Sequence, residues 1–302
     1  MEEIVGQGKH RYRVHWDWQQ APESVEVRAC AVAVDAEDRV YCFNRNKDHP
    51  IVIFDRDGKF AGSWGAGLFQ FPHAIRFDRD DNVWLTDEHY GQFFKFTKDG
   101  KLLQTIGERD ARSDTGVPND DYSSTAWKKV THGGAPFNLP TDIIQAPDGS
   151  YFMSDGYGNA RVHKFSKDLK LIKSWGEPGN GPGQFNLPHG LWIDSRGRLL
   201  VADRENDRVQ VFDQDGNLLT VWPTELIGVA FFYVDADDIV YVPEHNAGMI
   251  SILTLDGERL ARWGNEIHKS THGIWCDSQK NIYAVQPGEW GRIRRIVKYE
   301  RL

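Results

Sequence analysis

The sequence has little cysteine, no long apolar run and no excess of positive charge. Its three cysteines, Cys30, Cys42 and Cys276, are too few and too scattered for a disulfide framework or a Cys-x-x-Cys zinc knot, so we expect buried, reduced thiols. No apolar stretch approaches the roughly 20 residues that span a bilayer, which argues against a membrane segment. The net charge of −8 over 302 residues argues against nucleic acid or an anionic membrane as a partner.

The amino-terminal stretch M-E-E-I-V-G-Q-G-K-H is acidic and has no apolar core like that of a signal peptide. Together with the reduced cysteines, this predicts a cytoplasmic protein. A chain of 302 residues can bury a full hydrophobic core, and we expect a single domain over residues 1–302. Long helical periodicity is also absent, which points to a β protein.

One turn pattern recurs five times along the chain. It is followed each time by an ending that resembles S-W-G, as at Trp64-Gly65 and Trp175-Gly176. The turn aspartates stand at 57, 99, 168, 215 and 256, so the steps are 42, 69, 47 and 41 residues, and the step of 69 contains an insertion. The five copies are F-D-R-D-G-K-F (54–60), F-T-K-D-G-K-L (96–102), F-S-K-D-L-K-L (165–171), F-D-Q-D-G-N-L (212–218) and L-T-L-D-G-E-R-L (253–260).

Within each unit the pattern is typical of short β-strands. Runs such as V-A-V-D (32–35), L-L-V-A-D (199–203) and R-V-Q-V-F-D (208–213) are separated by tight turns. Units of about 40–50 residues with four short strands are typical of propeller blades. A sixth unit begins at His272, so we predict an all-β, six-bladed propeller. The run H-R-Y-R-V-H-W-D-W (10–18) is a spare strand that can complete the last blade and close the ring.

The longest irregular segment covers residues 108–136 and accounts for the long step between repeats. Irregular loops of this length in a compact domain are functional lids or disordered segments. Because the segment contains Trp127 and His132, we expect a loop that docks over one end of the propeller, as a possible lid.

Histidine recurs at one position of the repeat. Five residues before the end of each innermost strand, blades two, four and six have His73, His189 and His272. Alternate blades of a six-fold ring lie 120° apart, so the three imidazoles can converge on the axis and leave a fourth coordination position open, as in catalytic zinc sites. Imidazole also suits iron, copper or nickel. The equivalent positions of blades one, three and five are Cys30, Thr141 and Ala230.

A second position of the repeat, after the second strand of each blade, can face the same end. Tyr157 stands between Gly156 and Gly158, which permit unusual backbone angles that aim its phenol. The planar guanidinium of Arg45 can orient an anionic or carbonyl oxygen. The remaining residues here have more ordinary explanations: Asp155 and Asp203 as turn caps, Arg204-Glu205 as a surface ion pair of little energetic value, and His89 and His245 as weaker candidates.

Several motifs resemble known families. The run G-P-G-Q-F-N-L-P-H-G-L-W-I-D-S-R-G-R-L-L-V-A-D-R-E-N-D-R-V-Q-V-F-D resembles NHL repeats. Four segments together resemble the peptidyl-α-hydroxyglycine α-amidating lyase family: F-N-L-P-T-D-I-I (137–144), S-D-G-Y-G-N-A-R-V (154–162), P-G-Q-F-N-L-P-H (182–189) and V-A-D-R-E-N-D-R-V-Q-V-F (201–212). The likeness is strongest over residues 137–213 and weaker from about 30 to 285.

This resemblance implies a six-bladed propeller with a zinc ion held by three histidines. The matching residues are His73, His189 and His272, the same set that the register predicts. It further implies that Tyr157 and Arg45 are active-site residues. Enzymes of that family cleave the N–C bond of a carbinolamide and release an amide and glyoxylate.

The chain departs from the family at its third histidine motif. The family has M-P-H-D, in which the aspartate contacts a structural calcium ion and the methionine lies near the substrate, whereas this chain has S-T-H-G with Ser270 and Gly273. These replacements put the calcium site in question. Gly158 also stands where secreted animal members have a disulfide cysteine. We therefore expect the metal site to be kept and the substrate to differ.

The sequence favours a zinc-dependent lyase that acts on a small α-hydroxy or carbinolamide substrate, with Tyr157 as base and Arg45 as the group that holds a carboxylate or carbonyl. Another divalent metal in place of zinc stays open. A metal-dependent hydrolase such as a lactonase is one alternative, and a non-catalytic NHL scaffold is another. A small-molecule substrate is the expected partner, with no obligate protein partner.

Overall fold

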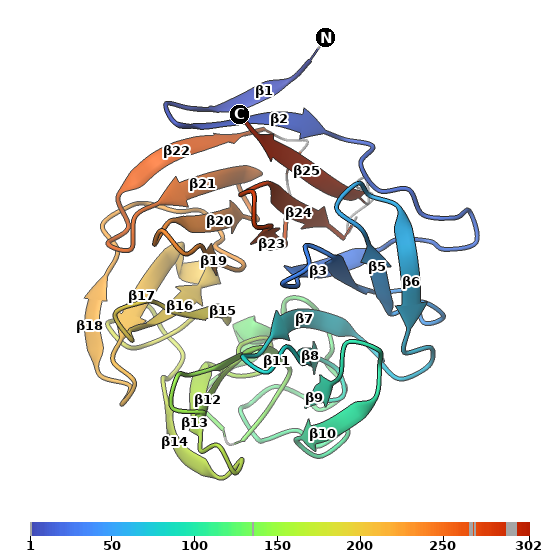
Figure 1. Ribbon diagram of the computed structural model, residues 1–302. Coiled ribbons are helices and arrows are strands. Elements are labelled where there is room, and N and C mark those ends of the chain that lie inside the picture. Colours follow the sequence, from blue (N-terminus) through green and yellow to red (C-terminus); the bar gives the residue numbers. More distant parts are fainter. Residues whose placement is uncertain (1, 135, 266–267, 269, 288–294) are drawn as a thin grey trace.

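The computed structural model describes residues 2–134, 136–265, 268, 270–287 and 295–302, and it has six antiparallel sheets arranged around an axis (Figure 1). In five of the sheets the strands run outward in chain order, and the sixth is completed by the two amino-terminal strands, which confirms the predicted six-bladed all-β propeller. The helical elements of the described part are two short 3₁₀ turns, η1 (Ala126–Lys129) and η2 (Arg204–Asn206).

The first three blades contain strands of four to six residues. Blade one consists of β3 (Ala29–Val34), β4 (Val40–Asn44), β5 (Ile51–Phe54) and β6 (Phe60–Trp64). Blade two consists of β7 (Pro72–Phe77), β8 (Val83–Asp87), β9 (Gln92–Phe96) and β10 (Leu102–Ile106). Blade three consists of β11 (Pro140–Gln145), β12 (Tyr151–Asp155), β13 (Arg161–Phe165) and β14 (Leu171–Trp175).

The remaining blades repeat this arrangement. Blade four consists of β15 (Pro188–Ile193), β16 (Leu199–Asp203), β17 (Arg208–Phe212) and β18 (Leu218–Val221). Blade five consists of β19 (Tyr233–Val234), β20 (Val240–Glu244), β21 (Met249–Leu253) and β22 (Arg259–Gly264). Blade six consists of β23 (Gly273–Cys276), β24 (Ile282–Gln286), β25 (Arg295–Arg301), β2 (His10–His15) and β1 (Ile4–Gln7).

The amino-terminal strand closes the ring, as predicted. β2 pairs antiparallel with β25, with Tyr12 opposite Arg301 and Val14 opposite Tyr299, so the two ends of the chain share one sheet. β1 then pairs with β2 as a fifth strand, which the repeat pattern did not predict. This closure pairs the edge that β25 would otherwise expose.

The repeated Asp-Gly turn and Trp ending are the two sides of a contact between neighbouring blades. A Cβ added at Gly100 would lie 2.9 Å from the ring of Trp64, and one added at Gly216 would lie 2.8 Å from the ring of Trp175. Both glycines have φ near +80 to +90°, which favours glycine at the turn. The turn and the tryptophan recur together because Trp64, Trp175 and Trp222 each pack on the turn of the next blade.

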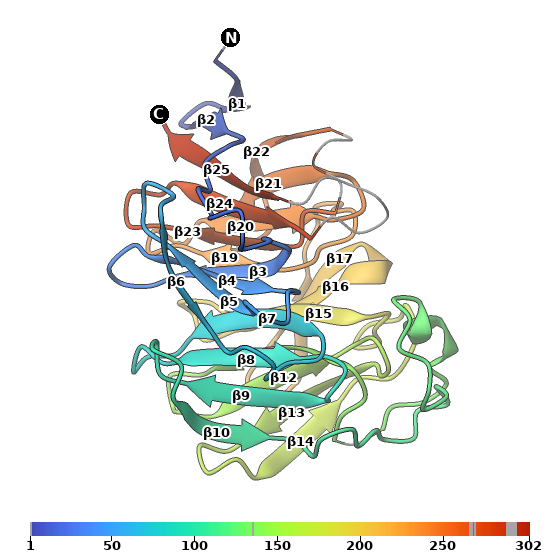
Figure 2. The same cartoon turned by 90° about the vertical axis from the view of Figure 1, so that its right-hand side faces the viewer.

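The three cysteines are reduced and buried, as predicted. The described part of the chain contains no helix long and apolar enough to cross a membrane. The insertion over residues 108–136, of which residue 135 lies outside the described part, projects from one face of the ring (Figure 2, green).

Candidate metal centre

His73, His189 and His272 meet on the axis of the propeller. His73 and His189 lie at the second positions of β7 and β15, and His272 immediately precedes β23. Their ring centroids are 4.7 to 5.0 Å apart, and their candidate ligand nitrogens all lie within 4.8 Å of one another. The side chains are almost wholly buried. The structure thus brings together the three histidines that the register placed on alternate blades, and we call this group the histidine cup.

Each histidine is oriented by the next blade. The Nδ1 atom of His73 is 2.6 Å from the carbonyl oxygen of Thr141, that of His189 is 2.8 Å from the oxygen of Ala230, and that of His272 is 2.7 Å from the oxygen of Cys30. A carbonyl oxygen only accepts, so Nδ1 carries the proton and donates in each pair. The six equivalent positions of the repeat therefore form one ring in which three blades supply imidazoles and three supply carbonyls.

The tautomers leave three Nε2 lone pairs facing the axis. Among the described residues, no hydrogen-bond partner is found for these three Nε2 atoms. Burial holds the pKa of each imidazole well below its usual value, and nearby positive charge adds to this: Arg45 beside His73 and Arg204 beside His189. Neutral imidazoles with free Nε2 atoms and Nδ1–H groups fixed on carbonyls are the form that binds zinc, so the cup can hold a metal ion.

Tyr157 lies beside the cup. Its ring centroid is 5.5 Å from that of His73 and 5.8 Å from that of His189. The hydroxyl oxygen accepts a 2.8 Å hydrogen bond from Nη1 of Arg204. A guanidinium N–H on a phenol oxygen stabilises negative charge there, which suits the oxygen to accept a proton.

Arg204 corrects the sequence interpretation. It is buried rather than part of a surface pair, and its Nε donates to Glu205 at 2.9 Å while Nη1 reaches Tyr157. Burial at this position could not be predicted, since the segment V-A-D-R-E-N-D has the charge pattern of an exposed turn. Asp203 and Asp155 do act as predicted, since both accept backbone N–H groups: from Asn186 at 2.8 Å and from Asn138 at 2.7 Å.

The glycines that flank Tyr157 have a different role from the one expected. Neither Gly156 nor Gly158 is among the residues with positive φ, so they do not supply unusual backbone angles. A Cβ at Gly156 would lie 2.2 Å from the oxygen of Pro188, and one at Gly158 would lie 2.2 Å from Oδ1 of Asn138. The glycines let the chain carrying Tyr157 approach the neighbouring backbone closely, and so bring the phenol to the cup.

Arg45 lies next to the chain that carries His73. Its Nε donates to the oxygen of Pro72 at 3.2 Å, and its guanidinium carbon is 3.9 Å from the centre of the Phe71 ring. Its charge contributes to the low pKa of both His73 and His272. The predicted residue is therefore near the cup, and its role in substrate binding stays a prediction.

Glu88 was not selected from the sequence, although its blade position is equivalent to that of Arg45. Its side chain is buried, and Oε2 is 3.9 Å from Nε2 of His73. Oε1 is 3.7 Å from Nε2 of His89, whose ring stacks on Phe71 at 4.2 Å. A carboxylate thus faces the cup from the second blade.

The inserted segment lies against this end of the propeller. Val117 and Ala126 pack against Tyr157 in one apolar cluster. A cavity of about 160 Å³ lies between η1 and the cup. Its walls include Trp127 and Lys128 of the insertion and Tyr157 and His272 of the site, together with Ser124, Thr125, Arg204, Glu205, His245 and Asn246.

Known proteins are similar to this chain in sequence and in fold. The NHL repeat family matches residues 185–212. The human NHL repeat-containing protein 3 is 34% identical over 224 residues, which cover 70% of this chain and 59% of that protein. Peptidyl-alpha-hydroxyglycine alpha-amidating lyase 1 of Drosophila melanogaster is 35% identical over 191 residues, which cover 58% of this chain and 31% of that protein.

The chain is a six-bladed β-propeller with an NHL repeat at residues 185–212, and its sequence resembles the peptidyl-α-hydroxyglycine α-amidating lyases. The match spans less than two thirds of the length of these relatives. A solved propeller, a gluconolactonase from Xanthomonas campestris, aligns with a TM-score of 0.68 at 12% identity over 99% of this chain and 95% of that chain. At 12% identity, the similarity between this chain and the gluconolactonase supports the fold alone.

Proposed function

We propose that this propeller is a zinc-dependent lyase that cleaves a small α-hydroxy or carbinolamide substrate. The observation that carries the proposal is the convergence of three neutral imidazoles next to a phenol whose oxygen accepts a guanidinium N–H. The resemblance to amidating lyases supports the same class of reaction. Reduced, buried thiols support a cytoplasmic setting.

Each residue of the site has a separate role in the proposed cleavage of a carbinolamide. Zinc held by the three Nε2 atoms would act as a Lewis acid that makes a substrate hydroxyl more acidic. The Tyr157 oxygen accepts the hydroxyl proton, the C=O bond forms as the C–N bond breaks, and the proton passes to the departing amide nitrogen. Arg204 stabilises the phenolate before the transfer, and Arg45 holds the carboxylate or carbonyl of the substrate.

The size of the site favours a small molecule over a long peptide. The cavity of about 160 Å³ is narrow for a peptide chain, and the insertion with Trp127 and Lys128 forms one wall. Lys128 adds a positive charge to that wall, which suits an anionic substrate. No nucleic acid, membrane or obligate protein partner is part of the proposal.

A product analysis in H₂¹⁸O tests the reaction type. The zinc-loaded protein is given a short acyl-α-hydroxyglycine, small carbinolamides and lactones. A lyase releases the acyl fragment as a primary amide without ¹⁸O, whereas a hydrolase releases a carboxylic acid that carries one ¹⁸O. Blanks without protein and with Tyr157→Phe correct for spontaneous cleavage. If amide formation with every substrate equals the blanks, the lyase proposal fails.

The second candidate function is a metal-dependent hydrolase, and Glu88 is the observation in its favour. Its buried carboxylate, 3.9 Å from Nε2 of His73, is placed to accept a proton from a water molecule in the cup. Glu88→Gln keeps the shape and removes the charge. Under the hydrolase proposal it abolishes ¹⁸O incorporation into the acid product, and under the lyase proposal amide formation continues.

A further inference from the structure

The axis of the propeller is crossed by Arg76, three residues after His73 on β7. The side chain is buried, and Nε and Nη2 donate to the two carboxylate oxygens of Asp142 at 3.1 and 2.6 Å. Nη2 also donates to the oxygen of Leu191 at 3.2 Å, and Nη1 donates to the oxygen of Phe232 at 3.2 Å. One guanidinium on blade two is thus bonded to blades three, four and five.

These acceptors are of the kind that bind calcium. Ca²⁺ in proteins takes carboxylate and backbone carbonyl oxygens, and here such oxygens are bonded to a guanidinium instead. Position 273, where the amidating lyases have their calcium-linked aspartate, has no room for a side chain: a Cβ on Gly273 would lie 2.9 Å from Cα of Ala31 and 3.1 Å from N of Val32. Within the described residues, the histidine cup is the one group of three or more candidate metal ligands. Position 273 therefore supplies no calcium ligand, and the oxygens around Arg76 are already bonded to a cation.

We infer that the Arg76 guanidinium is the structural cation of this axis, and that it positions the histidine cup. The second half of the inference rests on the proposed metal centre, and the first half does not.

Arg76 is bonded to the strands that orient the cup. Asp142 follows Thr141, whose carbonyl accepts the Nδ1–H of His73, and Asp142 Oδ2 also accepts the backbone N–H of Leu191 at 2.9 Å. Leu191 is two residues beyond His189. Phe232 is two residues beyond Ala230, whose carbonyl orients His189. Loss of the guanidinium would therefore loosen the His189 imidazole together with the carbonyls of Thr141 and Ala230.

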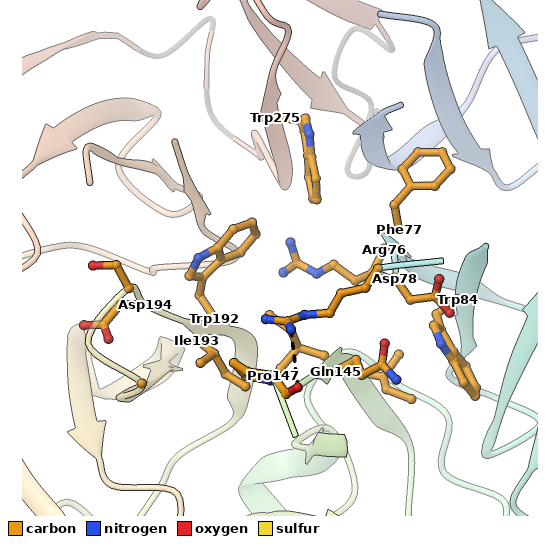
Figure 3. Close-up of a pocket in the computed structure, with 15 residues that line it drawn as sticks. Arg76, Phe77, Asp78, Trp84, Gln145, Pro147, Trp192, Ile193, Asp194 and Trp275 are labelled. Carbon is orange, nitrogen blue, oxygen red and sulfur yellow. Dashed lines mark hydrogen bonds between the residues drawn. The ribbon is translucent and has the colours of Figure 1, made fainter. Parts of the chain in front are cut away.

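Aromatic rings enclose the guanidinium on both sides. The Phe231 ring lies between it and the cup: its centroid is 4.8 Å from that of His189, and the guanidinium carbon of Arg76 is 5.5 Å from it. On the other side, the guanidinium carbon is 5.4 Å from the Trp192 ring and 5.7 Å from the Trp275 ring (Figure 3). These two tryptophans and Arg76 itself line a cavity of about 500 Å³. Arg76 and Asp142 are both buried, and burial strengthens their ion pair.

A calcium measurement tests the first half. Protein dialysed into calcium-free buffer should contain no stoichiometric calcium by elemental analysis, and its melting temperature should be the same with 1 mM CaCl₂ as with 1 mM MgCl₂. About one calcium per chain, or a rise in melting temperature specific to CaCl₂, would overturn the assignment of Arg76 as the axial cation.

A double-mutant cycle tests the ion pair itself. Arg76→Met and Asp142→Leu each leave one charge buried without its partner, so each should lower the melting temperature more than the combined change does. If the loss in the combined variant equals the sum of the two single losses, Arg76 and Asp142 are not coupled and the ion pair is not what holds the axis. Arg79→Ala is the matched control, because Arg79 stands three residues further along, is exposed and makes one 3.3 Å bond to Pro147. It should change neither stability nor metal binding.

Cobalt binding tests whether Arg76 positions the histidine cup. The affinity for Co²⁺ is measured on folded protein, so a loss of stability alone does not change it. Co²⁺ titration of folded protein, followed by the d–d spectrum, should give about tenfold or more weaker binding in Arg76→Lys and in the Arg76→Met/Asp142→Leu pair, as for other losses of outer ligand support. Parent-like affinity and spectra in both variants would overturn the positioning role. If the parent protein itself does not bind Co²⁺, both the proposed metal centre and the positioning role of Arg76 are wrong. The calcium measurement still tests whether Arg76 is the structural cation of the axis.

Discussion

The hydrogen bond between Arg204 and Tyr157 gives the sharpest test of the proposed chemistry. Tyr157→Phe keeps the ring that packs beside His73 and removes only the oxygen, so the fold and metal content should be retained. If that oxygen is the base, kcat should fall by about 10²- to 10⁴-fold. A hydrogen bond to a charged group contributes about 1.5–3 kcal/mol. At about 1.4 kcal/mol per tenfold, Arg204→Met should therefore lower kcat by roughly 10- to 150-fold.

The two changes should not be additive. Arg204 is almost wholly buried, and its bond to the Tyr157 oxygen is 2.8 Å, so its effect on kcat should be exerted through that oxygen. In the Tyr157→Phe background, Arg204→Met should cost only a few-fold. Arg204→Lys keeps the charge and should recover part of the loss.

The assay is the rate of primary amide formation by zinc-loaded protein, with zinc content and circular dichroism measured for each variant. Without Arg204 the acid limb of the pH–rate profile should move to higher pH, because the phenolate loses its stabilising cation. If Arg204→Met lowers kcat by the same factor with and without the Tyr157 hydroxyl, Arg204 acts independently of the phenol and the mechanism is wrong.

Four further outcomes are expected. His189→Ala should remove the metal, and retention of one equivalent by elemental analysis would refute the cup. Arg45→Lys should raise KM more than it lowers kcat, since it keeps the charge but loses the planar fork; an effect on kcat alone would contradict this role. Gly216→Ala should destabilise the fold more than Gly67→Ala in urea unfolding, because both have positive φ but only the first meets a tryptophan ring. Burial, followed by the charges of Arg45 and Arg112, lowers the pKa of His89 to about 4. Neutral His89 therefore contributes to the free energy of unfolding above pH 6.5, and this contribution is lost as the pH falls toward 4. Between pH 7 and pH 5 the parent should lose about 2 kcal/mol of unfolding free energy that His89→Phe does not lose.

The repeat alone determined the architecture. Strands at 199–203 and 208–213 were predicted from alternation and turns, and the structure has them at Leu199–Asp203 and Arg208–Phe212. Turn and tryptophan recur because each blade must present the same two surfaces to its neighbours. Register within the repeat also placed His73, His189 and His272 on alternate blades, since equivalent positions of a ring become neighbours on its axis.

Tertiary structure decided what the repeat does not encode. Burial turned Arg204 from an apparent surface charge into a partner of Tyr157, and it placed Glu88 beside His73. The same holds for Arg76, which has the sequence context of an exposed strand arginine but bonds to three other blades in the closed ring. Periodicity reports which face of a strand a residue occupies, because that depends on local geometry. The partner that a buried charge finds depends on segments that are distant in sequence, so only the closed ring brings Arg76 to Asp142.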